Sequence, residues 1–329
     1  MLRAAMAPTG LALQRTRQLA TAAVVAGFIL AALLLPQFTQ RRDVINLFFL
    51  MYLYITLAQS WNILAGYGGQ INLGHAAFFG IGALTTRTLW TEQDFPFAAA
   101  LLAGGAASVL FALVVGIPTF RLRGVYFAIG TLAMAEALRL TIANLLPNIT
   151  SLPGPVIARY DLEPRYYLAL ALALCTAVTV YLLPRTRLSL GILAVREDEE
   201  AAQALGVNPL VHKLIALALS SFFAGLAGGV FAYYHVSYYS SFAFSPNWTF
   251  DAVLASFVGG IGTLAGPIVG GSFFILVRER LAVSLVDVHQ IIFGVLFIVV
   301  VLTLPGGLVE ASSRLRSAVR RLLHHALNV

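Results

Sequence analysis

Apolar runs recur along almost the whole chain, and they restrict the possible fold more than any other feature of the sequence. A helix that crosses the roughly 30 Å hydrocarbon core of a bilayer needs about 20 mostly apolar residues. Only 11% of the residues are charged, against roughly 25% in soluble domains, so the composition argues against a water-soluble fold. Spans are expected near Leu19 to Leu35, Val44 to Ala65, Ile71 to Leu89, Phe95 to Ile117, Val125 to Leu146, Tyr166 to Leu183, His212 to Tyr234 and Ile291 to Leu304.

A further apolar region, Phe250 to Val277, is longer and interrupted. Its centre, Val258 to Pro267, reads VGGIGTLAGP, which is too rich in glycine and proline for a continuous helix in lipid. We interpret the region as two short segments around a buried break, which brings the total to ten spans. A re-entrant break, with nine spans, is the alternative. Either count predicts an all-α, polytopic integral membrane protein.

The basic residues favour ten spans, because short cytoplasmic loops are enriched in Lys and Arg. An even count places both ends in the cytoplasm, although Arg41 and Arg42 then fall in an external loop. We therefore expect a cytoplasmic amino terminus (1–18), a transmembrane domain (19–306) that contains a cytoplasmic loop (185–211), and a basic cytoplasmic tail (307–329). The net charge of +7 then reflects topology in the lipid bilayer rather than nucleic-acid binding.

The cytoplasmic loop contains a short acidic and alanine-rich tract. Glu200, Ala201 and Ala202 are followed, after three residues, by Gly206. Acidic residues suit a helix amino terminus, small alanines allow a partner surface to approach closely, and a glycine ends a helix. The tract matches the EAA-x-x-x-G pattern of ABC importer permeases, in which it docks an ATPase, but an ordinary solvated helix in the loop is the alternative.

Polar residues interrupt a second tract, which is apolar and rich in glycine. Gln70, Asn72 and His75 lie between Gly66 and Gly82, and lipid cannot satisfy their hydrogen-bonding groups. They must face other helices or a cavity. Together with Thr131 they are our candidates for the polar lining of a translocation path, and close helix packing with interhelical hydrogen bonds is the competing interpretation.

Four tracts together resemble LivM-type branched-chain amino-acid permeases. The first is WNILAGYGGQINLGHAAFFG at Trp61 to Gly80, and the second is RLRGVYFAIGTLA at Arg121 to Ala133. The third is the loop from Arg185 to Gly206, and the fourth is FVGGIGTLAGPIVGG at Phe257 to Gly271. They occur in the order of the family, and together they reach from Trp61 to Gly271, which is most of the chain.

The resemblance implies a function and a set of partners. It implies the membrane subunit of a binding-protein-dependent ABC importer in the bacterial inner membrane, with a type II importer permease fold. Its partners would be two cytoplasmic ATP-binding subunits, a second, related permease and a periplasmic substrate-binding protein. Glu200, Ala201, Ala202 and Gly206 would form the coupling helix, the partner subunits would hydrolyse ATP, and this chain would bind no cofactor. The segment Asn148 to Pro155 departs from the glycine-rich external loop of the family, which leaves urea or short amides as alternative substrates.

Other function classes find less support. The only lysine, Lys213, is not part of a phosphate-binding loop, so the chain has no ATPase motif of its own. Neither paired nucleophile and base residues nor a metal-ligand set stands out, and Cys175 is the only cysteine, so we expect no enzyme and no metal site. An ion-coupled secondary transporter is the main alternative; it would need ionisable groups near the midplane. Glu136 is such a group, but its spacing from Arg139 allows the two to pair.

Overall fold

The computed structural model describes residues 23–24, 26–39, 41–146 and 150–284, with scattered residues from 292 to 311. The chain divides into two compact units, Met1–Asn46 and Leu47–Val329. The first unit contains a short apolar helix, Ala26–Phe38, and an exposed ion pair between Arg41 and Asp43, at 2.8 Å. The amino terminus 1–18, the last expected span and most of the basic tail lie largely or wholly outside the described residues.

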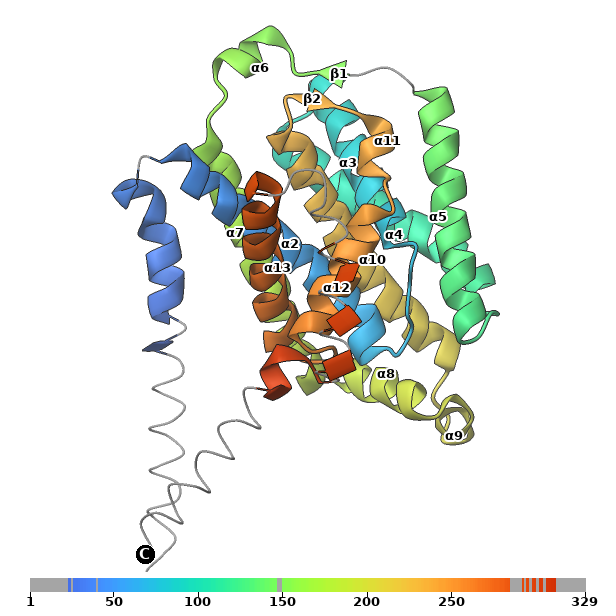
Figure 1. The fold of residues 1–329 in the computed structure, drawn as a ribbon. Coiled ribbons are helices and arrows are strands. Elements are labelled where there is room, and N and C mark those ends of the chain that lie inside the picture. Colours follow the sequence, from blue (N-terminus) through green and yellow to red (C-terminus); the bar gives the residue numbers. More distant parts are fainter. Residues whose placement is uncertain are drawn as a thin grey trace, which may run out of the picture. The chain divides into compact units, whose positions relative to one another are not determined.

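The described part of the chain is almost entirely helical (Figure 1). Its elements are α2 (Arg42–Asn62), η1 (Ile63–Tyr67), α3 (His75–Thr91), α4 (Phe97–Thr119), α5 (Val125–Leu145), β1 (Thr150–Ser151), α6 (Gly154–Ala158), α7 (Leu162–Leu182), η2 (Leu183–Arg185), α8 (Arg187–Glu197), α9 (Glu199–Ala204), α10 (Pro209–Tyr234), β2 (Ser237–Tyr238), α11 (Ser240–Ala243), α12 (Asn247–Gly259) and α13 (Ala265–Ser284).

Five helical segments among the described residues are long and apolar enough to cross a membrane. They are Arg42–Tyr67, Phe97–Thr119, Val125–Leu145, Leu162–Arg185 and Pro209–Tyr234. Each agrees within a few residues with an expected span, so the protein is a multi-pass, helical membrane protein. The first expected span is only partly described, as Ala26–Phe38.

The interrupted region after α11 has the predicted break. α12 ends at Gly259 and α13 begins at Ala265, and Gly260 and Gly262 between them have φ values of +125° and +75°. Only glycine adopts such backbone conformations without strain, which is why the helix stops here. The expected span Ile71 to Leu89 is partly wrong, because residues 68–74 are not helical and α3 begins only at His75.

Glycines bring α3, α4 and α10 into close contact at the centre of the second unit. A Cβ atom added at Gly82 would lie 2.1 Å from the carbonyl oxygen of Gly225, and one added at Gly228 would lie 1.9 Å from that of Phe79. One added at Gly104 would lie 2.7 Å from the carbonyl oxygen of Gly82. Real side chains cannot fit at such distances. The three helices therefore pack backbone against backbone, as small residues allow in membranes.

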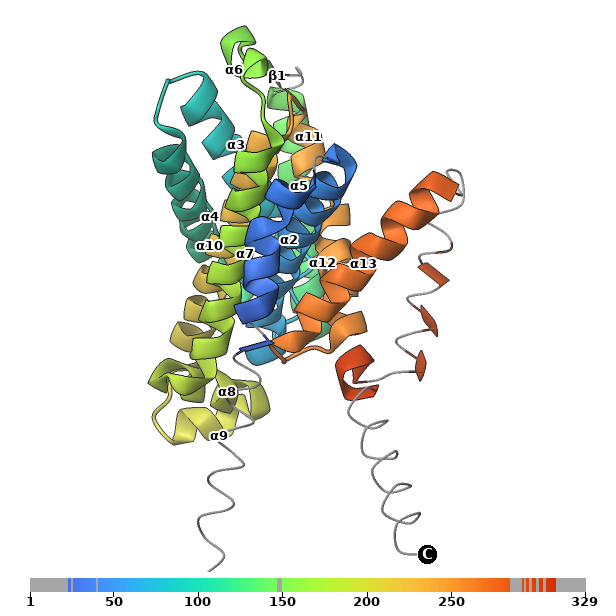
Figure 2. The same ribbon diagram turned by 90° about the vertical axis from the view of Figure 1, so that its left-hand side faces the viewer.

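Two regions lie at opposite ends of the second unit. Figures 1 and 2 both show α8 and α9 at one end, beside the start of α10, and α6 and β1 at the other. At that other end β1 pairs antiparallel with β2, with Thr150 opposite Tyr238 and Ser151 opposite Ser237. The pairing joins the segment before α7 to the segment after α10.

Candidate functional site

The alanine-rich tract of the loop forms the predicted short helix, α9. The side-chain Oδ1 of Asp198 caps its start by accepting hydrogen bonds from the backbone N–H groups of Glu200 and Ala201, at 2.9 and 3.0 Å. Gly206 ends it with a φ of +86°, in the left-handed conformation typical of helix carboxyl ends. Ala202 is buried, whereas Glu200, Ala201 and Gly206 are exposed. The helix thus has fixed ends and an exposed face.

A buried lysine attaches α9 to α10. Lys213 Nζ lies 2.6 Å from Glu199 Oε2, and only 6% of the lysine side chain is exposed. Glu200 has a weaker neighbour, Arg123, at 3.8 Å, and both side chains are largely exposed, so this pair contributes little. The buried pair therefore ties α9 to the start of a membrane-spanning helix.

Arg196, at the end of α8, joins the loop to the glycine-rich tract. Its Nη1 donates a hydrogen bond to the carbonyl oxygen of Gly66, at 2.6 Å. A Cβ atom at Gly69 would lie 2.8 Å from Arg196 Cγ, so the tract passes directly beside this side chain. The predicted helix α9 therefore begins three residues after Arg196, which contacts η1.

Asn62 then joins the glycine-rich tract to the break between α12 and α13. Its Oδ1 accepts a hydrogen bond from Gly262 N at 2.7 Å, and its Nδ2 donates one to Thr263 O at 3.0 Å. Gln59, one helical turn earlier, donates from Nε2 to Leu264 O at 2.7 Å. These amides satisfy the backbone of a segment that has no helical partners. Three tracts that are distant in sequence meet at this point: the loop, the glycine-rich tract and the break.

The four candidate path residues lie around the start of α3. Asn72 Oδ1 accepts a hydrogen bond from Gly74 N at 2.7 Å, and Thr131 Oγ1 accepts one from Leu73 N at 3.1 Å. His75 Nε2 lies 2.8 Å from Ser60 Oγ. Asn72, His75 and Thr131 are buried and Gln70 is partly exposed.

These contacts give the candidate path residues a packing role in the described conformation. The cavity that Asn72 and Thr131 help to line has a volume of about 10 Å³, which is close to the space of one water molecule. Asn72 Nδ2 and His75 Nδ1 are buried without a hydrogen-bond partner among the described residues. A role in lining a path stays a prediction.

Sequence reasoning missed two buried arginines, Arg87 on α3 and Arg165 on α7, whose side chains contact the carboxyl end of α10. Arg87 donates to the carbonyl oxygens of Ala232 and His235, both at 3.1 Å, and to that of Val236 at 3.0 Å. Arg165 donates to the carbonyl oxygen of Tyr233 at 2.9 Å. Carbonyl groups at the carboxyl end of a helix carry partial negative charge, so they stabilise both cations.

A second group that sequence reasoning missed connects α2, α12 and α13. Asp251 Oδ2 accepts hydrogen bonds from Tyr54 OH at 3.1 Å and from Arg278 Nη1 at 3.2 Å. Arg278 and the Tyr54 hydroxyl are also in contact. The ion pair bridges the two helices on either side of the break.

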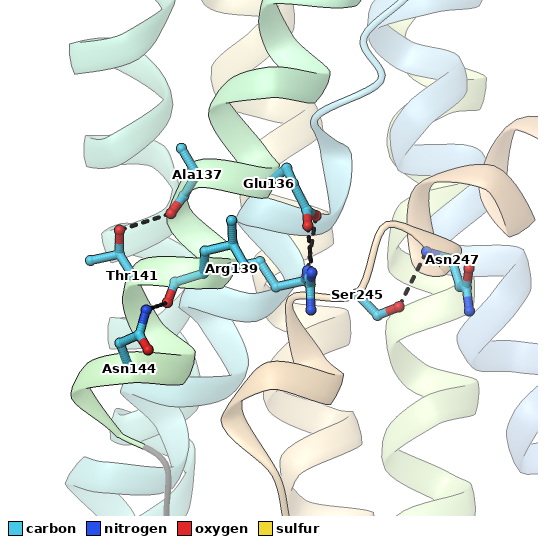
Figure 3. Close-up of polar contacts among 8 residues, drawn as sticks. Glu136, Ala137, Arg139, Thr141, Asn144, Ser245 and Asn247 are labelled. Carbon is cyan, nitrogen blue, oxygen red and sulfur yellow. Dashed lines mark hydrogen bonds and ion pairs between the residues drawn. The ribbon is translucent and has the colours of Figure 1, made fainter.

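Glu136 and Arg139 pair on α5, as their spacing allows. Arg139 Nε donates to Glu136 Oε2 at 2.8 Å, and Nη2 donates to Oε1 (Figure 3). In Figure 3 both side chains point toward Ser245, in the turn between α11 and α12, whereas Thr141 and Asn144 point away from it. Among the described residues no group of three metal-ligating side chains is found, and Cys175 is exposed on α7.

Comparison with known proteins places this chain in a family. The family described as branched-chain amino acid transport system / permease component matches residues 44–301. The high-affinity branched-chain amino acid transport system permease protein LivM is 28% identical in both Salmonella typhimurium and Escherichia coli, over 85% of this chain and 74% of each relative. A probable LivM of Methanocaldococcus jannaschii is 25% identical over 81% of this chain and 93% of the relative. No solved structure matches the chain significantly. The chain belongs to the family of permease components of branched-chain amino acid transport systems.

Proposed function

We propose that this chain translocates branched-chain or similar amino acids across the bacterial inner membrane, as one permease of an importer driven by ATP. The other subunits would be two cytoplasmic ATP-binding proteins, a second, related permease and a periplasmic substrate-binding protein. The observation that carries the proposal is the family match over residues 44–301, which includes every tract of the site.

The geometry of α9 supports docking to an ATP-binding subunit. A docking helix needs a defined orientation and an uncovered face. Asp198 and Gly206 fix the two ends of α9, and Glu200 and Ala201 lie on its exposed side, followed by Leu205, which is 85% exposed. An apolar side chain so fully exposed is favourable when a partner covers it.

Two contacts would transmit movement of α9 into the membrane. The buried pair of Lys213 and Glu199 attaches it to α10, and Arg196 attaches the preceding turn to Gly66. A phosphate-binding loop needs a lysine, and the only lysine of the chain, Lys213, is outside such a loop and engaged in this pair. The energy would therefore come from ATP hydrolysed by the partner subunits. This chain itself would hold no cofactor.

Ten spans and a type II importer permease fold are consistent with the described helices. The five long helices, α3, α12 and α13 would supply eight spans. The expected spans at 19–35 and 291–304 would supply the other two. With ten spans, the basic tail (307–329) lies on the cytoplasmic side of the membrane, the same side as the loop 185–211.

Two alternatives make different predictions. An ion-coupled secondary transporter would need an ionisable group that is free to exchange ions or protons, but Glu136 is held by Arg139. A permease for urea or short amides would share the coupling site and differ only in substrate. Substrate uptake therefore separates it from an amino-acid permease.

The experiment is to purify the tagged chain in mild detergent, identify its partners and measure leucine uptake in reconstituted vesicles. We expect a nucleotide-binding subunit and a second permease to co-purify, and leucine uptake to require ATP. Gly206→Val should lower uptake at least tenfold because valine is strained at a φ of +86° and distorts the end of α9. Gly154→Ala, at a position with open space around it, is the control. Uptake driven by an ion gradient without an ATPase would refute the proposal.

A further inference from the structure

α5 contacts the rest of the described chain through one narrow stripe. Its buried residues are Phe127, Thr131 and Ala135, which are four residues apart and share one face of the helix. Arg139 continues the same stripe by one more turn. The helix is about 31 Å long, so Glu136 and Arg139 lie near the middle of the bilayer if α5 spans it.

A charged pair at this depth must avoid lipid. The side chains of Arg139 and Glu136 are 30% and 37% exposed, so the described chain covers them only partly. Ionisable groups inside membranes are costly and generally face the interior of a bundle or a water-filled path. The uncovered side of this pair therefore faces protein or water in the assembled transporter.

A pocket lies beside the pair. It has a volume of about 420 Å³ and is lined by Arg139, Tyr239, Ser241, Phe242 and Ser245. The pocket is widely open on one side, so the described chain supplies only one wall of the site. The lining combines one cation, hydroxyl groups and two aromatic rings. Figure 3 shows the Arg139 guanidinium directed toward the segment of Ser245.

The guanidinium retains donors for a ligand. Glu136 accepts from Nε and Nη2, and Nη1 makes no hydrogen bond to any residue that the structure describes. A guanidinium binds carboxylates with good geometry, and its neighbouring carboxylate attracts an ammonium group. The pair is therefore complementary to a zwitterion.

We propose that this pocket is a subsite for the amino acid during its passage through the permease. Arg139 donates to the α-carboxylate, the negative charge of Glu136 beside the pocket attracts the α-ammonium group, and Phe242 and Tyr239 contact the apolar side chain. This inference rests on the proposed function, because it assumes that the transported solute is an amino acid. Unlike the buried residues near α3, the pocket has room for one.

The test exchanges the two charges in the complete reconstituted transporter. The double variant Glu136→Arg with Arg139→Glu keeps an ion pair three residues apart but places a carboxylate against the pocket. We expect leucine uptake to fall at least tenfold while ATP hydrolysis by the complex continues, so that less leucine is moved per ATP. Arg139→Gln should cause a similar loss, and Arg139→Lys a smaller one.

Thr141→Val is the matched control, since Thr141 lies on the opposite side of α5 and its hydroxyl bonds only to the backbone of Ala137 (Figure 3). It should retain uptake. Normal uptake by the charge-exchanged variant would overturn the inference, as would loss of the second permease from the purified complex, which would make the pair an interface contact. Absence of leucine uptake by the unmodified transporter would instead refute the proposed function.

Discussion

Arg87 shows how backbone carbonyl groups stabilise a buried cation inside this protein. Its side chain is buried, and its guanidinium meets three carbonyl groups at and just beyond the end of α10. Burial and the nearby guanidinium both lower the pKa of His235, which follows α10. The site thus favours a neutral imidazole beside a charged arginine.

Replacing Arg87 with lysine should destabilise the protein. A single ammonium group cannot reach three carbonyl oxygens spread along the helix end, and each lost bond to a charged group costs about 1.5 to 3 kcal/mol. We expect Arg87→Lys to lower the free energy of unfolding by about 2 kcal/mol, measured as a lower thermal midpoint in detergent. Arg185→Lys is the control, since Arg185 is exposed and interacts with one surface neighbour, Tyr181, through its carbonyl oxygen and its ring. Equal midpoints for the two variants would contradict this role.

Sequence patterns predicted local partners at the residue scale and missed distant ones. The pair of Glu136 and Arg139 follows from helical spacing. The partners of Arg87 are backbone groups about 145 residues away, and any residue type could supply them. Asp251 and Arg278 are 27 residues apart, and they meet only because the chain turns back between α12 and α13.

The elements near the loop are connected by side chains rather than by the backbone alone. Arg196 bonds to Gly66, and Asn62 bonds to Gly262 and Thr263, so hydrogen bonds link α8, η1 and the break. The break itself was predictable because glycine and proline mark it. The late start of α3 was not predictable, because Ile71 to Gly74 are mostly apolar. The side chains of Thr131 and Asn72 accept the hydrogen bonds of Leu73 N and Gly74 N, in place of helical carbonyl groups.

Removing the Arg196 side chain should separate ATP hydrolysis from transport. Arg196→Ala deletes the 2.6 Å contact to Gly66 while leaving α9 and its cap unchanged. We expect the assembled complex to hydrolyse ATP at a near-normal rate and to take up leucine about tenfold more slowly. Arg187→Ala, an exposed arginine at the start of α8, should behave like the unmodified chain. Unchanged uptake per ATP in Arg196→Ala would exclude a transmitting role for this contact.

On the scale of the whole molecule, the order of the helices assigns the two ends of the second unit to opposite sides of the membrane. α5 leads from the end with α8 and α9 to the end with α6, and α7 returns (Figure 2). Cys175 is the only cysteine, so a Cys175→Ala background allows new cysteines to be labelled one at a time. Ala158→Cys on α6 and Gln203→Cys on α9 both introduce exposed thiols.

With a membrane-impermeant maleimide, Ala158→Cys should react in intact cells, whereas Gln203→Cys should react only after permeabilisation. The physical reason is that α7, the one long helix between these two sites, is long enough to cross the hydrocarbon core. The unsubstituted Cys175→Ala chain is the blank. Reaction of both sites from the same side would mean that α7 does not span the bilayer, and reaction of Gln203→Cys in intact cells would remove α9 from the side on which an ATP-binding subunit could dock.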